Sequence, residues 1–545
     1  MIPTDIGNDR VVDTMSMEKM AHESLTTTLL DECAYDHPVD VITLHETHIS
    51  WVFLTGMYAY KIKKPVDFGF LDFSTLEKRQ HFCEEELRVN GRLAPELYLA
   101  VVPIRGDITS ARINGDGPVI EYAVKMRQFD TQQEFDELLV RNELTTTHID
   151  ETARVLAEFH KNISVANEAT AYGNPEVIQQ PVLENFEQIN QLGEEWLTLQ
   201  QLNESLTILH QWSIDQYQRL KTTLMNRKQN GFVRECHGDL HLKNIVLYNN
   251  KVTPFDGIEF NANLRWIDVM SELAFLLMDL DDHNRPDLAR RLLNSYLGIT
   301  GDYEGLAVLR FYQVYRAMVR AKVAGLQLLQ HNANRTNENN NLTQEILNYI
   351  QLAIRYTQTT APRLIITYGL SGSGKSFLSQ KLLEQCDIIR IRSDVERKRL
   401  FGMEENTRDM AGINKGIYTR EASDKTYQHL LELSGKIINA GYSVIVDAAF
   451  LRIEQRKLFM DFCNESDIPF QILHCEANLN VQRQRLHLRQ IQDLDASDAS
   501  ETILNRQLNH YDPLTTAEKS FTLTIDTTEN IEISAVIKWV EKSHQ

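Results

Sequence analysis

One short segment restricts the possible folds of this chain more than any other. Residues 369–376 read GLSGSGKS, and they stand between the apolar run RLIITY and the helical pattern SFLSQKLLEQ. A glycine-rich loop between a strand and a helix is typical of a site whose backbone N–H groups converge on phosphate at a helix N-terminus. The segment therefore predicts a parallel sheet covered by helices, with a nucleotide phosphate site at this loop.

Each part of the loop has an expected role in binding ATP. The amine of Lys375 reaches the outer phosphates, and the hydroxyl of Ser376 ligates Mg²⁺. A simple Gly/Ser turn before a helix is the alternative, but the glycines, the lysine and the serine all stand in register. The predicted nucleotide-binding residues of the loop are Gly369, Leu370, Ser371, Gly372, Ser373, Gly374, Lys375 and Ser376.

Bulk composition narrows the class of protein. A length of 545 residues exceeds what one hydrophobic core usually supports, and 42% hydrophobic with 24% charged residues is typical of globular proteins. The net charge of -20 disfavours a protein that wraps nucleic acid or binds an anionic membrane. The six cysteines are far apart without metal-binding spacing. With no membrane-length apolar run and no signal peptide pattern, we expect a cytoplasmic protein; the composition indicates no oligomeric state.

The pattern of elements divides the chain into segments. Residues 1–40 are largely polar and predict a poorly ordered segment. Residues 41–355 begin with alternating strand patterns and continue with helical periodicity, which predicts a sheet-rich lobe before a helical lobe. The Asn-rich stretch 330–343 suits an exposed loop between helices. After TQTTAPR, residues 362–545 alternate short apolar strands with helices, as in a parallel sheet wound with helices.

Charged residues follow the later strands of the C-terminal segment. Asp394 and Arg397 come after IIRIR, at the carboxyl edge where ligands of such sheets bind. Asp394 could accept the proton of an acceptor hydroxyl, or it could cap a helix. Asp447 ends SVIVD and could hold Mg²⁺ through water or face the acceptor. Arg485 and Arg489 lie four residues apart, as arginines of a lid over the triphosphate or as a solvated helix face.

These motifs resemble the P-loop kinases that include polynucleotide 5'-hydroxyl kinases, zeta-type toxins and small-molecule kinases of the gluconate and chloramphenicol type. The resemblance covers most of residues 363–540. In several of these proteins an Asp-x-x-Arg after the second strand orients or deprotonates the acceptor hydroxyl, which implies that role for Asp394 and Arg397. The stretch DASDAS and Gln507 also resemble the lid region of these kinases.

A second motif lies in the N-terminal half. The segment ECHGDLHLKNIVLYNN contains Asp239 and, five residues later, Asn244, and PFDGIEF adds Asp256. A loop carboxylate can deprotonate a hydroxyl, while Asn and a following Asp can reach the Mg²⁺ ions that bridge ATP phosphates. A buried histidine beside a turn-capping aspartate is the alternative. The HGDLH run resembles the aminoglycoside and choline phosphotransferase branch of the protein-kinase-like fold over residues 40–330, which implies a base at Asp239 and metal ligands at Asn244 and Asp256.

Such a fold also requires a lysine on an early strand and a glutamate on a helix to hold it. The run YAYKIKK offers Lys61 and Lys63 on the same side of a strand. Lys61 better fits the pattern of an apolar residue, any residue, an apolar residue and lysine. Its partner is Glu85 or Glu86. The predicted nucleotide-binding pair takes Lys61 and Glu86, with Lys63 and Glu85 as the alternatives.

Two further features of this half bear on the resemblance. The glycine-rich loop usual in such folds is missing, because the first hairpin offers Gly56 alone. Asp268 and Glu272 stand one turn apart at the start of a predicted helix. The related proteins often keep a carboxylate there that braces the catalytic loop, although acids at a helix N-terminus are also favoured by the helix dipole.

The sequence thus predicts a fold of class α/β and α+β, with an N-terminal protein-kinase-like two-lobe domain followed by a P-loop NTPase parallel-sheet domain. The expected function is ATP- and Mg²⁺-dependent transfer of phosphate to a hydroxyl of a small molecule. A nucleotide-driven switch that transfers nothing is one alternative, but it would not need carboxylates such as Asp239 and Asp394 on the acceptor side. A nucleic-acid 5'-hydroxyl kinase is another, and the acidic net charge disfavours it.

Overall fold

The computed structural model arranges the chain as two compact units, each of which is built from segments distant in sequence. The first comprises 1–144, 163–172 and 231–272, and the second comprises 145–162, 173–230 and 273–545. Among the described residues, no helix is both long and apolar enough to cross a membrane. The predicted domain limits 41–355 and 362–545 stay predictions. The described residues are 24–69, 71–330, 336–403, 417, 419–492, 500–529 and 531–542.

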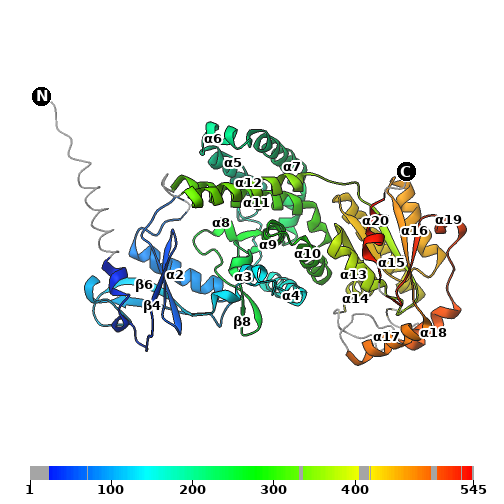
Figure 1. The fold of residues 1–545 in the computed structure, drawn as a ribbon, viewed down its shortest axis with the longest axis horizontal. Helices are drawn as coiled ribbons and strands as arrows, with labels where there is room; N and C mark the ends of the chain where they lie inside the picture. Colours follow the sequence, from blue (N-terminus) through cyan, green and yellow to red (C-terminus); the bar gives the residue numbers. More distant parts are fainter. Residues whose placement is uncertain are drawn as a thin grey trace. The chain divides into compact units, whose positions relative to one another are not determined.

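An antiparallel six-stranded sheet forms the first part of the first unit (Figure 1). The alternation of apolar and polar residues predicted these strands, and their inner faces are buried. Helix α2 (Leu76–Asn90) starts after the N-cap Thr75 and packs against two of the strands. The sheet order is β1 (Thr43–Glu46), β2 (Ser50–Leu54), β3 (Tyr58–Lys63), β6 (Val119–Arg127), β4 (Tyr98–Arg105) and β5 (Arg112–Ile113).

The start of the chain contributes to this sheet's core. Residues 1–23 of the predicted poorly ordered segment lie outside the described residues. From residue 24 on, the segment differs from that prediction, because Leu25, Leu29 and Ala34 are buried in the cluster that contains Phe53. Their apolar side chains cover one face of the sheet, which offsets the entropy cost of ordering the segment.

Short elements complete the first unit and hold two segments in place: the HGDLH segment and the DG turn formed by Asp256 and Gly257. Two antiparallel strand pairs frame these segments. The elements are η3 (Thr131–Gln133), α3 (Phe135–Val140), β7 (Val233–Glu235), η4 (Leu242–Asn244), β8 (Ile245–Tyr248), β9 (Lys251–Pro254), α8 (Ala262–Arg265) and β10 (Trp266–Asp268).

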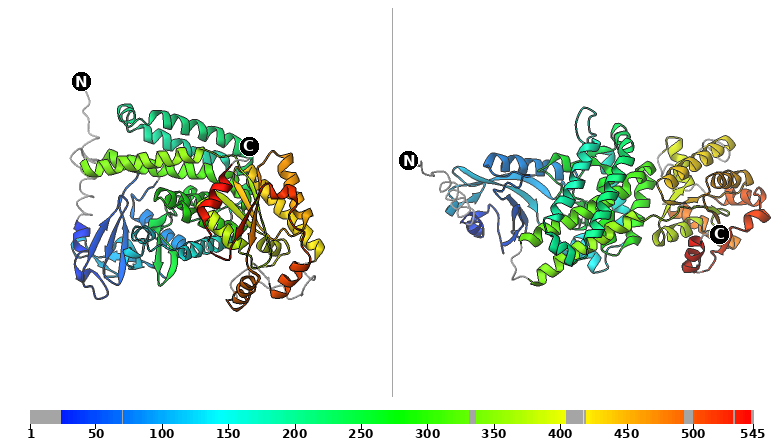
Figure 2. Two further views of the ribbon diagram at one scale, coloured as in Figure 1. Left: turned by 45° about the vertical axis from the view of Figure 1, so that its right-hand side comes forward. Right: turned by 90° about the horizontal axis from the view of Figure 1, so that it is seen from above.

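Helices form the first part of the second unit. Helices α11 and α12 lie side by side along their lengths (Figures 1 and 2). The predicted loop at 330–343 is wrong from residue 336 on, because α12 begins there and buries Leu342 and Ile346. Packing of an apolar face outweighs the poor helix propensity of asparagine. The elements are α4 (Thr146–Asn162), α5 (Pro175–Asn190), α6 (Glu194–Leu199), α7 (Asn203–Gln229), α9 (Val269–Asp282, shared with the first unit), α10 (Pro286–Thr300), η5 (Tyr303–Gly305), α11 (Leu306–Gln330) and α12 (Thr336–Thr357).

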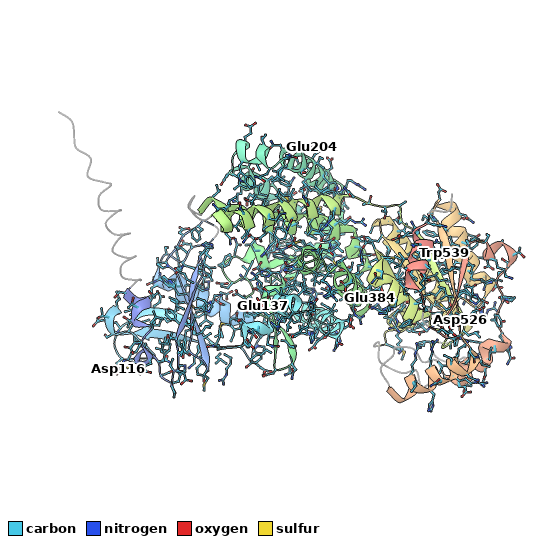
Figure 3. The ribbon with its side chains drawn as sticks, in the orientation of Figure 1. Asp116, Glu137, Glu204, Glu384, Asp526 and Trp539 are labelled. Atoms are coloured by element: carbon cyan, nitrogen blue, oxygen red, sulfur yellow. The ribbon has the colours of Figure 1, made fainter. Side chains whose placement is uncertain are left out.

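A five-stranded parallel sheet forms the rest of the second unit and confirms the predicted fold class. Its order is β12 (Ile388–Arg392), β13 (Ser443–Asp447), β11 (Leu364–Tyr368), β14 (Phe470–Glu476) and β15 (Thr522–Asp526). Figure 3 marks Asp526 at the end of β15 and Trp539 on α20. The GLSGSGKS loop follows the central strand, all of whose residues are buried. The helices are α13 (Lys375–Gln385), α14 (Ser393–Leu400), α15 (Arg420–Asn439), α16 (Ile453–Glu465), α17 (Leu479–Gln492), α18 (Glu501–Asn509), α19 (Thr516–Lys519) and α20 (Ile533–Glu541).

Candidate active sites

The GLSGSGKS loop has the backbone shape that phosphate binding requires. Gly374, the residue before α13, has a φ of 91°. A Cβ atom on it would lie 2.7 Å from the hydroxyl oxygen of Thr527, so both conformation and space require glycine. Because α13 begins at Lys375, the free N–H groups of its first turn face the loop. A glycine-rich loop at a helix N-terminus is an arrangement that can bind an anion.

Lys375 lies folded back onto this loop. Its Nζ donates to the carbonyl oxygens of Gly369 at 2.9 Å and Leu370 at 2.8 Å. Burial lowers the pKa of Lys375, although the nearby carboxylates of Asp447 and Asp394 oppose this effect. The amine therefore rests on neutral acceptors that a phosphate oxygen could replace with a stronger, charged partner.

Side chains from α17 and α18 also contact the loop. Arg485 Nη1 donates to the carbonyl of Gly372 at 3.2 Å, and Gln507 Oε1 accepts from the amide of Ser371 at 2.8 Å. Arg489 lies one helical turn beyond Arg485, and its charge contributes to the lowered pKa of Lys375. The predicted DASDAS stretch lies outside the described residues except for Ser500.

Asp447 lies at the end of β13 beside the first turns of α13. Asp447 is 5% exposed, and its carboxylate accepts a hydrogen bond from Ser379 Oγ at 3.3 Å. Ser379 stands one turn along the helix from Ser376, so the predicted hydroxyl and carboxylate ligands occupy the same end of α13. Oxygen donors of these two kinds suit Mg²⁺.

Asp394 and Arg397, the acceptor-side pair, both lie on α14. Asp394 is the second residue of the helix, whose N-cap position belongs to Arg392, so Asp394 does not occupy the capping position. Arg397 is 8% exposed, and its Nη1 donates to the carbonyl of Ile417 at 3.0 Å. The two residues are three apart and share one face of the helix.

The HGDLH loop of the first unit is fixed by hydrogen bonds at both ends. His237 Nε2 donates to the carbonyl of Phe255 at 2.7 Å, and its Nδ1 accepts from the amide of Asp239 at 3.3 Å. This pattern requires the neutral ring, and burial lowers the pKa of His237 accordingly. The carboxylate of Glu272 accepts from the amides of His237 at 3.0 Å and Gly238 at 2.7 Å.

Glu272 therefore braces the loop, whereas Asp268 accepts from the amide of Met270 at 2.9 Å within the start of α9. The sequence left open whether these acids brace the catalytic loop or stand at a helix N-terminus. The first role applies to Glu272 and the second to Asp268. Gly238 itself has a φ of 90°, and a Cβ atom there would lie 2.8 Å from the carbonyl oxygen of Leu264. The loop consequently admits no side chain at this position.

The predicted base and metal ligands of the first unit lie together. Asn244 Nδ2 donates to the carboxylate of Asp239 at 3.2 Å and to its carbonyl at 2.9 Å. The carbonyl of Asn244 accepts from the amide of Phe255 at 2.9 Å, and Asp256 is the next residue after this contact. Asp256 has a φ of 60° and a side chain that is 44% exposed. Carboxylate and amide oxygens are among the ligands that Mg²⁺ prefers.

Both candidate lysines of β3 contact Glu86. Lys61 Nζ lies 2.8 Å from Glu86 Oε1 and 2.5 Å from Asp256 Oδ1, and Lys63 Nζ lies 2.7 Å from Glu86 Oε2. Lys63 also pairs with Glu259. Burial opposes ionisation of Glu86, but the two lysine charges lower its pKa to about 2. Lys61 is 13% exposed and Lys63 only 1%, so only Lys61 opens toward Asp256 and solvent.

The alternative glutamate has other partners. Glu85 accepts from Arg88 and lies 3.1 Å from Arg265 Nη2, in a cluster that includes Glu235. Adjacent residues of a helix differ by about 100° in direction, so the two glutamates face different neighbours.

Sequence reasoning did not identify two residues that support this site. Glu259, three residues beyond Asp256, is the second acidic partner of the buried Lys63. Asn90 at the end of α2 accepts from the amide of Gly257 at 2.6 Å, which ties the DG turn to the helix that carries Glu86. The spacing of Glu259 from Asp256 was a possible signal, whereas the Asn90 contact joins residues 167 positions apart.

Replacing Lys63 by methionine is expected to lower the free energy of unfolding by about 3–5 kcal/mol, because Glu86 and Glu259 would remain buried without their shared cation. Urea-dependent hydrogen exchange of β3 measures this loss. Lys61→Met is the matched control, since its amine is nearer solvent, and we expect a smaller loss. Equal effects of the two substitutions would contradict the structural role of Lys63.

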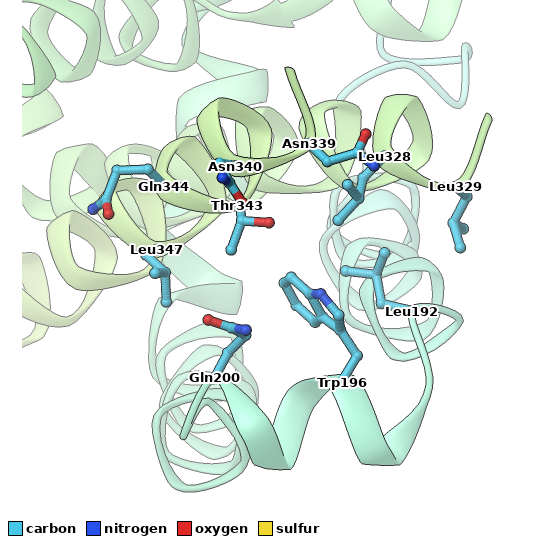
Figure 4. Close-up of a pocket in the computed structure, with 10 residues that line it drawn as sticks. All are labelled: Leu192, Trp196, Gln200, Leu328, Leu329, Asn339, Asn340, Thr343, Gln344 and Leu347. Carbon is cyan, nitrogen blue, oxygen red and sulfur yellow. The ribbon is translucent and has the colours of Figure 1, made fainter. Parts of the chain in front are cut away.

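A hollow elsewhere in the second unit is unsuited to this chemistry. Its volume is about 650 Å³, and Trp196 of α6 projects into it toward α12 (Figure 4). Its described lining contains no acidic or basic side chain, so it offers neither a base nor a phosphate-binding cation. The lining residues are Leu192, Trp196, Gln200, Leu328, Leu329, Asn339, Asn340, Thr343, Gln344 and Leu347.

Known proteins resemble the chain in sequence, and solved structures align with parts of it. Uncharacterized proteins of Mycobacterium tuberculosis and Mycobacterium bovis are 26% identical over 465 residues, which is 85% of this chain and 89% of theirs. Among solved structures, a choline/ethanolamine kinase family protein from Mesorhizobium loti is 10% identical with a TM-score of 0.33, covering 61% of this chain and 99% of that one. A gluconokinase from Sinorhizobium meliloti is 17% identical with a TM-score of 0.23, covering 33% and 89%.

The family comparison concerns the parallel sheet. Residues 364–514 match the family described as AAA domain. This stretch begins with β11, contains the GLSGSGKS loop and extends through α18. Residues 364–514, here called the P-loop domain, are therefore similar to that family.

Proposed function

We propose that this chain is an ATP- and Mg²⁺-dependent phosphotransferase with two nucleotide sites, each of which transfers the γ-phosphate of ATP to a hydroxyl of a small molecule. The observation that carries the proposal is the connected set in the first unit. Lys61 contacts Glu86 and Asp256, while Asn244 holds the carboxylate of Asp239. A phosphate-binding cation, metal ligands and a base are the parts that phosphoryl transfer requires.

In the first unit, Asp239 accepts the proton of the acceptor hydroxyl while the hydroxyl oxygen forms a bond to the γ-phosphorus. The bond between that phosphorus and the oxygen it shares with the β-phosphate breaks, and ADP leaves. Glu272 and His237 keep the backbone of this loop in place. Asn244 and Asp256 would hold Mg²⁺, which supplies charge neutralisation at the bridging phosphate oxygens. Lys61 would exchange its contact with Asp256 for the phosphates, and Glu86 would remain its fixed partner.

In the P-loop domain, the backbone of residues 369–374 and the amine of Lys375 bind the phosphates. Ser376 and Asp447 would hold Mg²⁺ at the start of α13, and Arg485 and Arg489 of α17 balance the charge of the triphosphate. Asp394 takes the proton of the acceptor hydroxyl, and Arg397 orients that group. The acidic chain, with a net charge of -20, favours a small acceptor over a nucleic acid.

The test follows label from γ-labelled ATP with Mg²⁺ into a fractionated metabolite and RNA extract. Full-length protein is compared with Asp239→Asn and Asp394→Asn. We expect label in a small-molecule fraction, with each substitution removing one product. Label in RNA ends would identify a nucleic-acid kinase in the P-loop domain. ATP binding without any transfer to a fraction would support the nucleotide switch and refute the proposal.

A further inference from the structure

One face of α10 contacts three successive parts of the P-loop domain, all within the second unit. The residues are Arg290, Arg291, Asn294 and Gly298, which lie within about 100° of one another around the helix. Arg290 pairs with Asp387 at 2.6 Å and Arg291 with Glu384 of α13 at 2.7 Å. The first contact of this face is therefore with the end of the helix that begins at the phosphate loop.

The second contact is with the edge strand of the parallel sheet. The side-chain amide of Asn294 accepts from the amide of Arg390 at 2.7 Å and donates to the carbonyl of Ile388 at 3.2 Å. This pair of bonds takes the place of a neighbouring strand on β12. Asn294 is 7% exposed, so the contact is buried. Strand β12 leads directly into α14, which carries the acceptor-side pair.

The third contact holds α14 itself. Glu396 is 1% exposed and accepts from the hydroxyl of Tyr303 at 3.2 Å, and it also pairs with Arg399. The guanidinium of Arg399 donates to the carbonyls of Gly298 and Ile299 at the end of α10. A cation at the C-terminal carbonyls of a helix is electrostatically favoured.

We call the contacts of Glu396 and Arg399 with Tyr303 and the end of α10 the anchor of α14. On the helix, this anchor lies opposite the acceptor-side pair. Residues two apart on a helix differ by about 200° in direction. Glu396 and Arg399 therefore lie on the face opposite to Asp394 and Arg397. A rotation of α14 that breaks the anchor would move the carboxylate of Asp394 by the same angle.

We propose that Glu396, Arg399 and Tyr303 are positioning residues that set the Asp394 carboxylate through α14, so that the acceptor side of the P-loop site depends on the end of α10. The role in transfer rests on the proposed function of the P-loop domain. The ATP-binding side is held separately, since Lys375 bonds to its own loop. Loss of the anchor should therefore affect transfer without weakening nucleotide binding.

The experiment uses the full chain carrying Asp239→Asn, which should reduce transfer by the first unit about 10²- to 10⁴-fold. Arg399→Met removes the anchor, and Tyr303→Phe removes only the hydroxyl. Arg399→Lys keeps a cation and should restore much of the effect. Glu304→Gln is the matched control, because its exposed pair with Lys436 lies next to Tyr303 but does not touch α14. The readouts are hydrogen exchange of 393–400 and 375–385, affinity of the P-loop site from azido-ATP labelling of its peptides, and phosphate release from Mg-ATP with water as acceptor.

With Arg399→Met we expect about tenfold faster exchange in residues 393–400, unchanged exchange in 375–385 and unchanged nucleotide affinity. Phosphate release should fall about tenfold in this variant but fall no further when Asp394→Asn is already present, because the two changes act through one group.

Three results would overturn the proposal: unchanged exchange in 393–400, equally faster exchange in 375–385, or the same fall of phosphate release in the Asp394→Asn background. Absence of phosphate release from the protein with intact α14 residues would instead show that water does not accept phosphate at the P-loop site. Hydrogen exchange then decides by itself whether the anchor holds α14.

Discussion

Lys375→Met is expected to weaken ATP binding at the P-loop by about 10- to 100-fold, because it removes a charge-assisted bond to phosphate. The variant should still fold, because the amine of Lys375 donates only to two neutral carbonyl oxygens. Hydrogen bonds of this kind contribute little to stability. Photolabelling with an azido analogue of ATP, followed by peptide mass spectrometry, measures binding at each site separately.

The matched control for this prediction is Lys381→Met, which removes an exposed cation from the same helix. Its pair with Glu384 is at the surface, so binding should stay unchanged. If labelling of the P-loop peptides depends on nucleotide concentration in Lys375→Met as it does in the unsubstituted protein, the assignment of that lysine to phosphate binding is refuted.

Asp239→Asn is expected to reduce transfer by the first unit about 10²- to 10⁴-fold, the usual contribution of a general base. Asparagine has nearly the same shape, and its side-chain oxygen can still accept from Asn244, so the loop should keep its conformation. The rate is measured in a chain that carries Lys375→Met, so that the P-loop site contributes little.

Glu137→Gln serves as the control for this second prediction, because it neutralises an exposed acid of α3 in the same unit. Nucleotide affinity should stay unchanged in both variants. If Asp239→Asn transfers phosphate at the original rate, the HGDLH loop has only a structural role. If it loses both binding and hydrogen-exchange protection, the carboxylate supports the fold and not the reaction.

Contiguous features of the sequence were the most predictable. The GLSGSGKS loop contains its own glycines, lysine and serine, and its flanking strand and helix could be recognised from local patterns. All five strands of the parallel sheet likewise coincide with short apolar runs. By contrast, the sequence could not decide between Glu85 and Glu86, because the choice depends on the rotation of α2 relative to β3.

Contacts between distant residues were beyond sequence reasoning. The helical spacing of Arg485 and Arg489 predicted a shared face, but only the structure places Arg485 on the backbone of Gly372. The pairing of Lys63 with Glu259 joins positions 196 residues apart. The Asn-rich start of α12 was misjudged because its apolar residues gain burial that composition does not reveal.

Asn294 also has a consequence for any attempt to divide the protein. A fragment beginning at residue 362 would keep all five strands of the parallel sheet but lose the side chain that bonds to Ile388 and Arg390. The outer strand would then present open backbone donors and acceptors to water, and exposed strand edges of this kind recruit other strands. Such a fragment would tend to self-associate edge to edge, so the size of its particles in solution would report whether this edge is covered.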